Sequence, residues 1–364
     1  MRKQISQASW AALWLTLAAL PIVVMVHSAY FASSVSPVMQ LNQQQRSAAV
    51  KLHLAQGLNL WQQQQYAAAL HDFAKANELG SPDAGLYQQY GQQWLTAQQS
   101  APLVIEQNSL QAWAPQACLQ QILFVTSELD SLPQASRFIH QFKADKRLAS
   151  LPICIAANIV FEPHLLPCAS PYKNARITCD IKPLAPKLEN KQFTHLVVFA
   201  KHGKANVHNG IMYLDQQDTY DVLVHELAHF AGFVDEYPLS SELAATVCKQ
   251  GKAPNLVFKR VNEGQIDTQY WQSLKQNTNV ALTPARTCDN HSSQAFKPSA
   301  KLTFMEYYDV ARIPEFYLAA WQQALKQPKN LTPAFINFAQ TFEEQPASPY
   351  ATYWRKRYEQ FYYN

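Results

Sequence analysis

Residues 225–237 read His-Glu-Leu-Ala-His-Phe-Ala-Gly-Phe-Val-Asp-Glu-Tyr, and this stretch decides the fold because its chemistry needs a helix followed by a sharp turn. In a helix, residues four apart share a face, so the imidazoles of His225 and His229 can bind one metal ion. Glu226 then projects beside the metal toward a bound water molecule and can act as a general base. This pattern is typical of the active site of a zinc peptidase.

The third metal ligand has to come from beyond this helix, because a catalytic zinc site has three protein ligands and one open position. Gly232 allows the helix to end in a left-handed conformation, and the resulting turn can bring Asp235 back to the metal. Glu236 directly follows Asp235 and competes with it as a ligand. Glu242 would be the ligand in a thermolysin-like arrangement, in which the third ligand lies on a later helix.

The pattern H-E-x-x-H-x-x-G-x-x-D resembles the metzincin clan of zinc endopeptidases, in its variant with aspartate as third ligand. The trailing Asp-Glu-Tyr is most similar to the IgA-peptidase-like family. The resemblance implies that Zn²⁺ is bound by His225, His229 and Asp235, with Glu226 as the base, in an α/β (α+β) domain with a mixed sheet. Ala228 departs from the pattern, because the family usually has glycine before its second histidine.

The resemblance also implies a methionine turn below the metal. Residues 303–307, Thr-Phe-Met-Glu-Tyr, are similar to the Ser-x-Met-x-Tyr of astacin-like metzincins. Met305 would form a hydrophobic floor under the metal, and Tyr307 would hydrogen-bond the oxyanion or act as a loose extra ligand. The long separation between His229 and Met305 implies an insertion.

The composition of the 364 residues is that of a folded protein, with 48% hydrophobic and 15% charged residues. The chain is long enough for one large or two ordinary domains. A formal net charge of +4, without a basic tract, gives no indication of nucleic-acid binding.

The N-terminus has the features of an export signal. Arg2 and Lys3 precede a mostly apolar stretch, residues 10–32, which is long enough to span a bilayer. We therefore expect residues 1–34 to be a signal anchor with a transmembrane helix, and a cleaved signal peptide is the alternative. The catalytic domain would then be periplasmic and anchored in the inner membrane, or periplasmic or secreted after cleavage.

The six cysteines all lie beyond this segment, and their even number indicates disulfide bonds formed in an oxidising compartment. No two of them have the C-x-x-C spacing that a second zinc site favours. Sequence alone leaves the pairing open. We favour Cys248 with Cys288, because that bond would staple the predicted insertion.

Residues 45–98 are rich in Gln, Ala and Leu and have helical periodicity. Their spacing is similar to that of a tetratricopeptide repeat, in which small residues let two antiparallel helices approach while Tyr66 and Phe73 fill the groove between them. The matching positions are Gly57, Tyr66, Ala69, Phe73, Ala76, Pro82 and, one repeat later, Gly91. The segment is either a helical module packed on the catalytic domain or a docking site for a protein partner.

Residues 118–364 are predicted to form the metallopeptidase domain. Strand and helix patterns alternate up to the metal helix at 219–231, and helices follow Met305. The metzincin resemblance implies an edge strand within 203–214, above the metal. The predicted strands are 122–127, 152–161, 176–181 and 193–200, and the other predicted helices are 133–146, 313–326, 332–344 and 350–363.

These features predict an exported zinc endopeptidase that acts on a peptide or protein substrate. One alternative is a non-catalytic interaction protein that uses the tetratricopeptide-like helices and a structural metal. Another is an amidase that acts on peptidoglycan or another non-protein substrate. Glu226 favours catalysis, because a structural metal site does not need a carboxylate directed at water.

Overall fold

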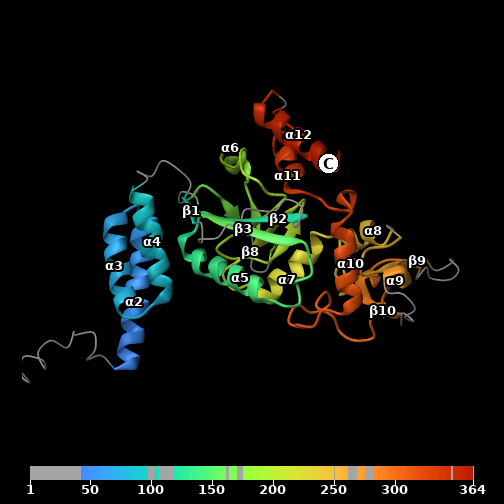
Figure 1. Cartoon of the computed structure of the whole chain (residues 1–364), viewed down its shortest axis with the longest axis horizontal. Coiled ribbons are helices and arrows are strands. Elements are labelled where there is room, and N and C mark those ends of the chain that lie inside the picture. Colours follow the sequence, from blue (N-terminus) through green and yellow to red (C-terminus); the bar gives the residue numbers. More distant parts are fainter. Residues whose placement is uncertain are drawn as a thin grey trace, which may run out of the picture. The chain divides into compact units, whose positions relative to one another are not determined.

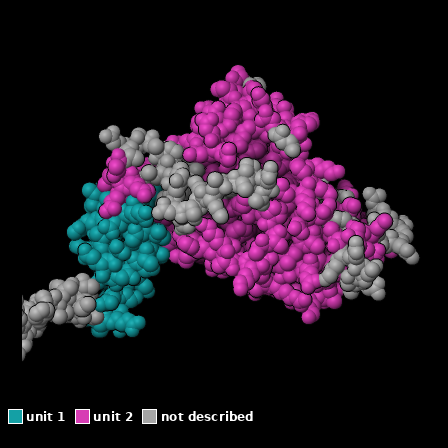
Figure 2. Space-filling model, viewed as in Figure 1, with its two compact units in different colours: residues 1–91 teal, residues 92–364 magenta. Residues whose placement is uncertain are grey.

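The structure is a computed structural model that describes most of the chain beyond residue 41. The described ranges are 42–96, 103–105, 118–160, 164–169, 175–249, 251–260, 269–274, 282–345 and 347–363. The chain divides into two compact units, residues 1–91 and residues 92–364 (Figure 2).

The first unit consists of helices, and the boundary between the units falls within the last of them. They are α2 (Gln43–Gln62), α3 (Tyr66–Glu78) and α4 (Pro82–Thr96). A Cβ atom added at Gly57 would lie 2.5 Å from the ring of Phe73, so α2 and α3 approach closely only because position 57 carries no side chain. Phe73 is fully buried, as the repeat pattern predicts for the groove between the helices. The identification as a tetratricopeptide repeat stays a prediction.

The second unit is built on a six-stranded mixed sheet with the strand order β1-β3-β2-β6-β8-β7 (Figure 1). The four central strands are parallel to one another, and the edge strands β1 and β7 are antiparallel to their neighbours. In this order the strands are β1 (Leu103–Ile105), β3 (Ile153–Val160), β2 (Gln120–Thr126), β6 (His195–Phe199), β8 (Ile211–Leu214) and β7 (Asn206–His208). This confirms the predicted mixed α/β fold.

Helices cover both faces of the sheet, because its central strands are apolar on both sides. On β6, Val197 and Phe199 belong to the core beneath one face, whereas Leu196 and Val198 belong to the core beneath the other. The first face packs against α5 (Leu132–Ala144), α7 (Tyr220–His229) and α10 (Glu315–Leu325). The second packs against α6 (Ala185–Leu188), α11 (Ala334–Thr341) and α12 (Pro349–Tyr363).

The predicted insertion between α7 and Met305 has its own small core and a three-stranded sheet with the order β10-β11-β9. Its elements are α8 (Ser241–Val247), β9 (Val257–Arg260), α9 (Gln269–Leu274), β10 (Thr283–Ala285) and β11 (Ser293–Lys297). The insertion also contains the short 3₁₀ helix η4 (Arg286–Cys288). The other described 3₁₀ helices of the second unit are η2 (Leu129–Ser131), η3 (Lys182–Leu184) and η5 (Pro328–Asn330). A disulfide joins Cys248, at the end of α8, to Cys288, which confirms that predicted pairing.

The other cysteines are paired as well, and none is free. Cys118 is joined to Cys154, across the beginnings of β2 and β3. Cys168 is joined to Cys179, which links β4 (Cys168–Ala169) to β5 (Thr178–Cys179).

The predicted fold needs one correction, which concerns its transmembrane helix. Within the described part of the chain, no helix combines the length and the apolar character that a bilayer requires. The segment for which the span was predicted, residues 10–32, lies outside the described residues. Among the described residues, the fold consists of the mixed α/β unit and the helical unit.

Candidate metal centre

The helix α7 presents the two histidines from a largely buried position. The Thr219 side chain caps its start by accepting a hydrogen bond from the backbone N–H of Val222 at 3.4 Å. The helix ends at His229, and Gly232 then adopts a φ of +81°, in the left-handed region that favours glycine. The turn at Gly232 returns the chain to the histidines, as the sequence predicts.

The structure brings three potential ligand atoms together at this turn. The Nε2 atoms of His225 and His229 lie 3.3 Å apart. Oδ1 of Asp235 lies 3.1 Å from Nε2 of His225 and 3.2 Å from Nε2 of His229. In a tetrahedral zinc site with bonds of about 2.0 to 2.1 Å, ligand atoms are about 3.3 to 3.4 Å apart. The three side chains therefore have nearly the spacing that a zinc ion requires.

Backbone carbonyl groups fix the orientation of both imidazoles. Nδ1 of His225 donates a hydrogen bond to the carbonyl oxygen of Phe304 at 2.7 Å, and Nδ1 of His229 donates one to that of Phe233 at 2.9 Å. In the neutral imidazole, a protonated Nδ1 leaves Nε2 with a lone pair. Both lone pairs then converge on the same small volume, where they repel each other unless a cation or a proton lies between them.

The close approach of Asp235 to the two histidines also shifts the pKa values of these groups. Burial lowers the pKa of His229, but the charge and the hydrogen bond of Asp235, together with Glu226 and the carbonyl of Phe233, more than offset this effect and raise the pKa to about 9. Burial alone would raise the pKa of Asp235, yet the two histidines bring it well below its usual range. A single anionic oxygen thus faces two nitrogen ligands, and this donor set suits Zn²⁺.

Glu226 lies next to the three ligands and is only 7% exposed. One carboxylate oxygen of Glu226 and one nitrogen each of His225 and His229 all lie within 4.8 Å of one another. Burial raises the pKa of Glu226, and the nearby histidines partly offset that effect. A raised pKa makes this carboxylate a better proton acceptor.

Glu236, the competing ligand, points away from the histidines into a fully buried hydrogen-bond network. Its carboxylate accepts hydrogen bonds from the hydroxyls of Thr303 at 2.5 Å and Tyr317 at 2.6 Å. It also accepts one from Nδ2 of Asn255 at 3.0 Å, and Nζ of Lys297 lies 3.4 Å away. Burial raises the pKa of Glu236, whereas these hydrogen bonds lower it. The two adjacent carboxylates thus have different environments.

Residues 303–307 contribute to the centre mainly through their backbone. Besides the bond from His225 to Phe304, the backbone N–H of Glu236 donates to the carbonyl oxygen of Met305 at 2.9 Å. Met305 itself is fully buried. Its role as a floor under the metal stays a prediction.

The remaining predicted residues lie apart from the ligand cluster. Tyr307 is 53% exposed and does not line the cavity described below. Glu242, the ligand of the thermolysin-like alternative, is exposed on α8. Neither residue contacts the ligand atoms in the described structure.

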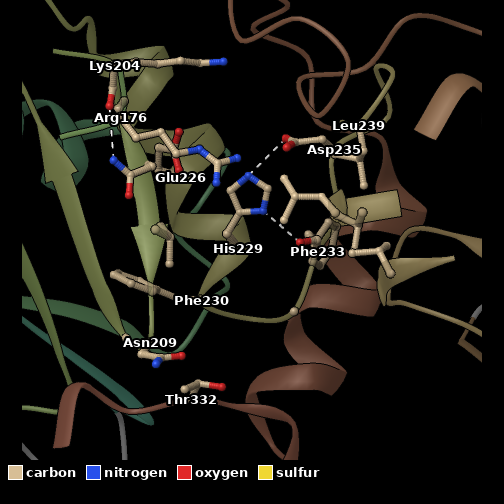
Figure 3. Close-up of a pocket in the computed structure, with 18 of the residues that line it drawn as sticks. Arg176, Lys204, Asn209, Glu226, His229, Phe230, Phe233, Asp235, Leu239 and Thr332 are labelled. Atoms are coloured by element: carbon tan, nitrogen blue, oxygen red, sulfur yellow. Dashed lines mark hydrogen bonds and ion pairs between the residues drawn. The ribbon is translucent and has the colours of Figure 1, made fainter. Parts of the chain in front are cut away.

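A cavity of about 340 Å³ opens onto Glu226, His229 and Asp235 (Figure 3). It also contains residues that the sequence reasoning did not select, namely Tyr237, Arg176 and Lys204. Burial, Asp235 and Glu226 raise the pKa of Tyr237, so its hydroxyl stays protonated and can orient the Asp235 carboxylate. The position of Tyr237, two residues after the ligand, is a signal that could have identified it.

In our comparisons with known proteins, no family model matches the chain, and no curated protein or solved structure matches it significantly.

Proposed function

We propose that this chain is a zinc-dependent endopeptidase. The observation that carries the proposal is the convergence of Nε2 of His225, Nε2 of His229 and Oδ1 of Asp235 to within 3.1 to 3.3 Å of one another. The three atoms lie beside a buried glutamate at an open cavity, and a metal that serves only a structural role needs neither of these features.

The residues of the centre have separate tasks. His225, His229 and Asp235 would hold the zinc, which when bound supplies Lewis acidity and makes water more acidic. Glu226 accepts a proton from the attacking water and passes it to the nitrogen of the leaving amine. Tyr237 holds the Asp235 carboxylate in place.

The cavity is suited to an extended peptide because it lies beside a sheet edge. Strand β7 is the edge strand on this side, and Asn206 and Val207 from it line the cavity. An extended segment can add to such an edge through main-chain hydrogen bonds, which do not depend on sequence. This favours a peptide substrate over the non-protein amides that share the same bond chemistry.

The pairing of all six cysteines supports a location in an oxidising compartment, the periplasm or the cell exterior. Thiol labelling of the denatured, unreduced protein tests this. We expect no free thiols, whereas labelling of most cysteines would contradict an oxidising location.

Digestion of a peptide library by the zinc-loaded protein tests the activity. We expect Glu226→Ala to bind zinc normally but to lose about 10²- to 10⁴-fold in rate, as expected for the loss of a general base. Glu242→Ala is the matched control, because it removes an exposed glutamate outside the cavity. A Glu226→Ala protein as active as the wild type would contradict the assignment of the base.

A further inference from the structure

Arg176 and Lys204 line the catalytic cavity, and neither side chain takes part in the proposed hydrolysis. Arg176 lies next to Lys204 in a short parallel bridge. The backbone N–H of Lys204 donates to the carbonyl of Ala175 at 2.8 Å, and that of Ile177 donates to the carbonyl of Lys204 at 3.1 Å. Ala175 and Ile177 are buried, so this backbone is anchored while both charged side chains remain exposed.

Both cations lie beside the catalytic groups. Nζ of Lys204 lies 6.0 Å from the ring centre of Tyr237, and Arg176 and Lys204 line the same cavity as Glu226. Figure 3 shows both cations on the Glu226 side of the cavity, across from Leu239.

Neither cation forms an ion pair with a carboxylate among the described residues. The carboxylates that line the cavity are Glu226 and Asp235. Asp235 faces the two histidines, and Glu226 is the buried proton acceptor. A zinc ion would balance these two negative charges, which leaves the charges of Arg176 and Lys204 available to a substrate.

We propose that Arg176 and Lys204 form a subsite for a carboxylate of the substrate, so that the enzyme prefers acidic peptides. The inference rests on the proposed peptidase function and names its substrate class. A guanidinium and an ammonium side by side bind a carboxylate by charge-assisted hydrogen bonds. The carboxylate belongs either to an Asp or Glu side chain near the scissile bond or to the C-terminus of the peptide.

The opposite wall of the cavity has a different character. It is apolar and includes Leu239, Leu243 and Val247, the last two from α8. The cavity therefore has a positively charged wall and an apolar wall. A substrate with an acidic group on one side of the scissile bond would have an apolar side chain on the other side.

The test uses the full chain loaded with zinc. Peptides cleaved in the library digestion are resynthesised with Glu or Gln at each position around the scissile bond, and with a free or amidated C-terminus. At one position or at the C-terminus, we expect the carboxylate form to be cleaved with a kcat/KM about tenfold higher, the value of a hydrogen bond to a charged group. The Glu and Gln peptides test for a side-chain carboxylate, whereas the peptides with a free or amidated C-terminus test for the terminal carboxylate.

The variants Arg176→Gln and Lys204→Gln should each lower this preference, mainly through KM, and the double variant should bring the ratio close to one. Arg355→Gln, an exposed cation on α12 outside the cavity, is the matched control and should keep the wild-type ratio. Zinc content is measured for every variant, so that loss of metal is not mistaken for loss of selectivity.

Equal cleavage of carboxylate and neutral peptides by the wild type would overturn the subsite while leaving the peptidase function intact. Retention of the preference by the double variant would also overturn it. If no peptide is cleaved, the peptidase proposal fails, and fluorescence anisotropy with pairs of library peptides that differ only in Glu or Gln decides the subsite by itself. Equal affinities would then refute it.

Discussion

Replacement of Glu236 tests whether the two adjacent carboxylates have the separate tasks that the structure gives them. Glu236→Ala removes the acceptor for Thr303, Tyr317 and Asn255 without changing a zinc ligand. Lys297 keeps a second partner, Glu306, at 2.5 Å. We therefore expect this substitution to reduce the stability of the fold and to leave the metal ligands in place.

The expected loss in the free energy of unfolding follows from the three donors that lose their acceptor. Each buried donor left unsatisfied costs about 1 to 3 kcal/mol, and loss of one partner of a buried charged pair costs about 3 to 5 kcal/mol in total. We take about 3 to 5 kcal/mol, because water entering the vacated space satisfies part of the network. At roughly 2 to 4 °C per kcal/mol, the melting temperature should fall by about 6 to 20 °C.

Glu236→Gln is the isosteric companion variant. One carboxylate oxygen of Glu236 faces Thr303 and Lys297, and the other faces Tyr317 and Asn255. The new amide nitrogen would therefore meet a nitrogen donor in either orientation. We expect Glu236→Gln to be destabilised as well, although less than Glu236→Ala, because its volume is retained.

The assay is thermal unfolding followed by circular dichroism in the presence of a chelator, so that zinc affinity does not contribute to the result. Zinc content is measured separately on the folded proteins. Asp235→Ala, the matched control, should lose zinc with a smaller change in the melting temperature of the metal-free protein. If Glu236→Ala melts within about 2 °C of the wild type and loses its zinc, the assignment of the two carboxylates is wrong.

Three further predictions concern other parts of the chain. Burial lowers the pKa of His195 from its ordinary value of 6.5 to about 3. Below about pH 6.5 the unfolded chain therefore binds a proton at His195 that the folded chain excludes. The free energy of unfolding, measured by denaturant titration, should fall by about 2 to 3 kcal/mol between about pH 6 and about pH 4. It should fall less steeply in His195→Leu. Gly57→Val should destabilise the helical unit by about 1 to 3 kcal/mol, because the new Cβ would overlap the ring of Phe73. The amides of α2 and α3 should then exchange hydrogen faster, and unchanged exchange would contradict the close packing. Replacement of Cys248 and Cys288 by Ser should cost about 2 to 4 kcal/mol in chemical unfolding and should expose the insertion to proteolysis; equal stability would show that the bond does not constrain it.

Local patterns in the sequence predicted the features that depend on neighbouring residues. The four-residue spacing of His225 and His229 placed both on one face of α7, and Gly232 provided the left-handed turn toward Asp235. The apolar runs gave β2, β3 and β6 close to their observed bounds, whereas the fourth central strand, β8, was not predicted as a separate strand. These features depend on periodicity and on backbone conformation, which a short stretch of sequence encodes directly.

Features that depend on contacts between distant residues could not be predicted in this way. Arg176 reaches the cavity only because its segment pairs with Lys204, and no local pattern indicates that pairing. The resemblance to the methionine turn of astacin-like metzincins implied a place for Tyr307 near the metal, but the direction of its side chain depends on how residues 303–307 pack. The donors around Glu236 come from four separate segments, so its burial was not visible in the sequence either.

The position of Glu236 explains why the insertion belongs to the same unit as the metal centre. Asp235 can face the histidines only if the next side chain points elsewhere, and in this turn it points into the protein. A buried glutamate needs donors, and the insertion provides them through Asn255 and Lys297, while Thr303 comes from the segment that follows. The same segment, residues 303–307, accepts the hydrogen bond of His225. The insertion and the methionine segment are thus connected to the first and third ligands through one network, which stabilises the turn that carries Asp235 without providing a zinc ligand.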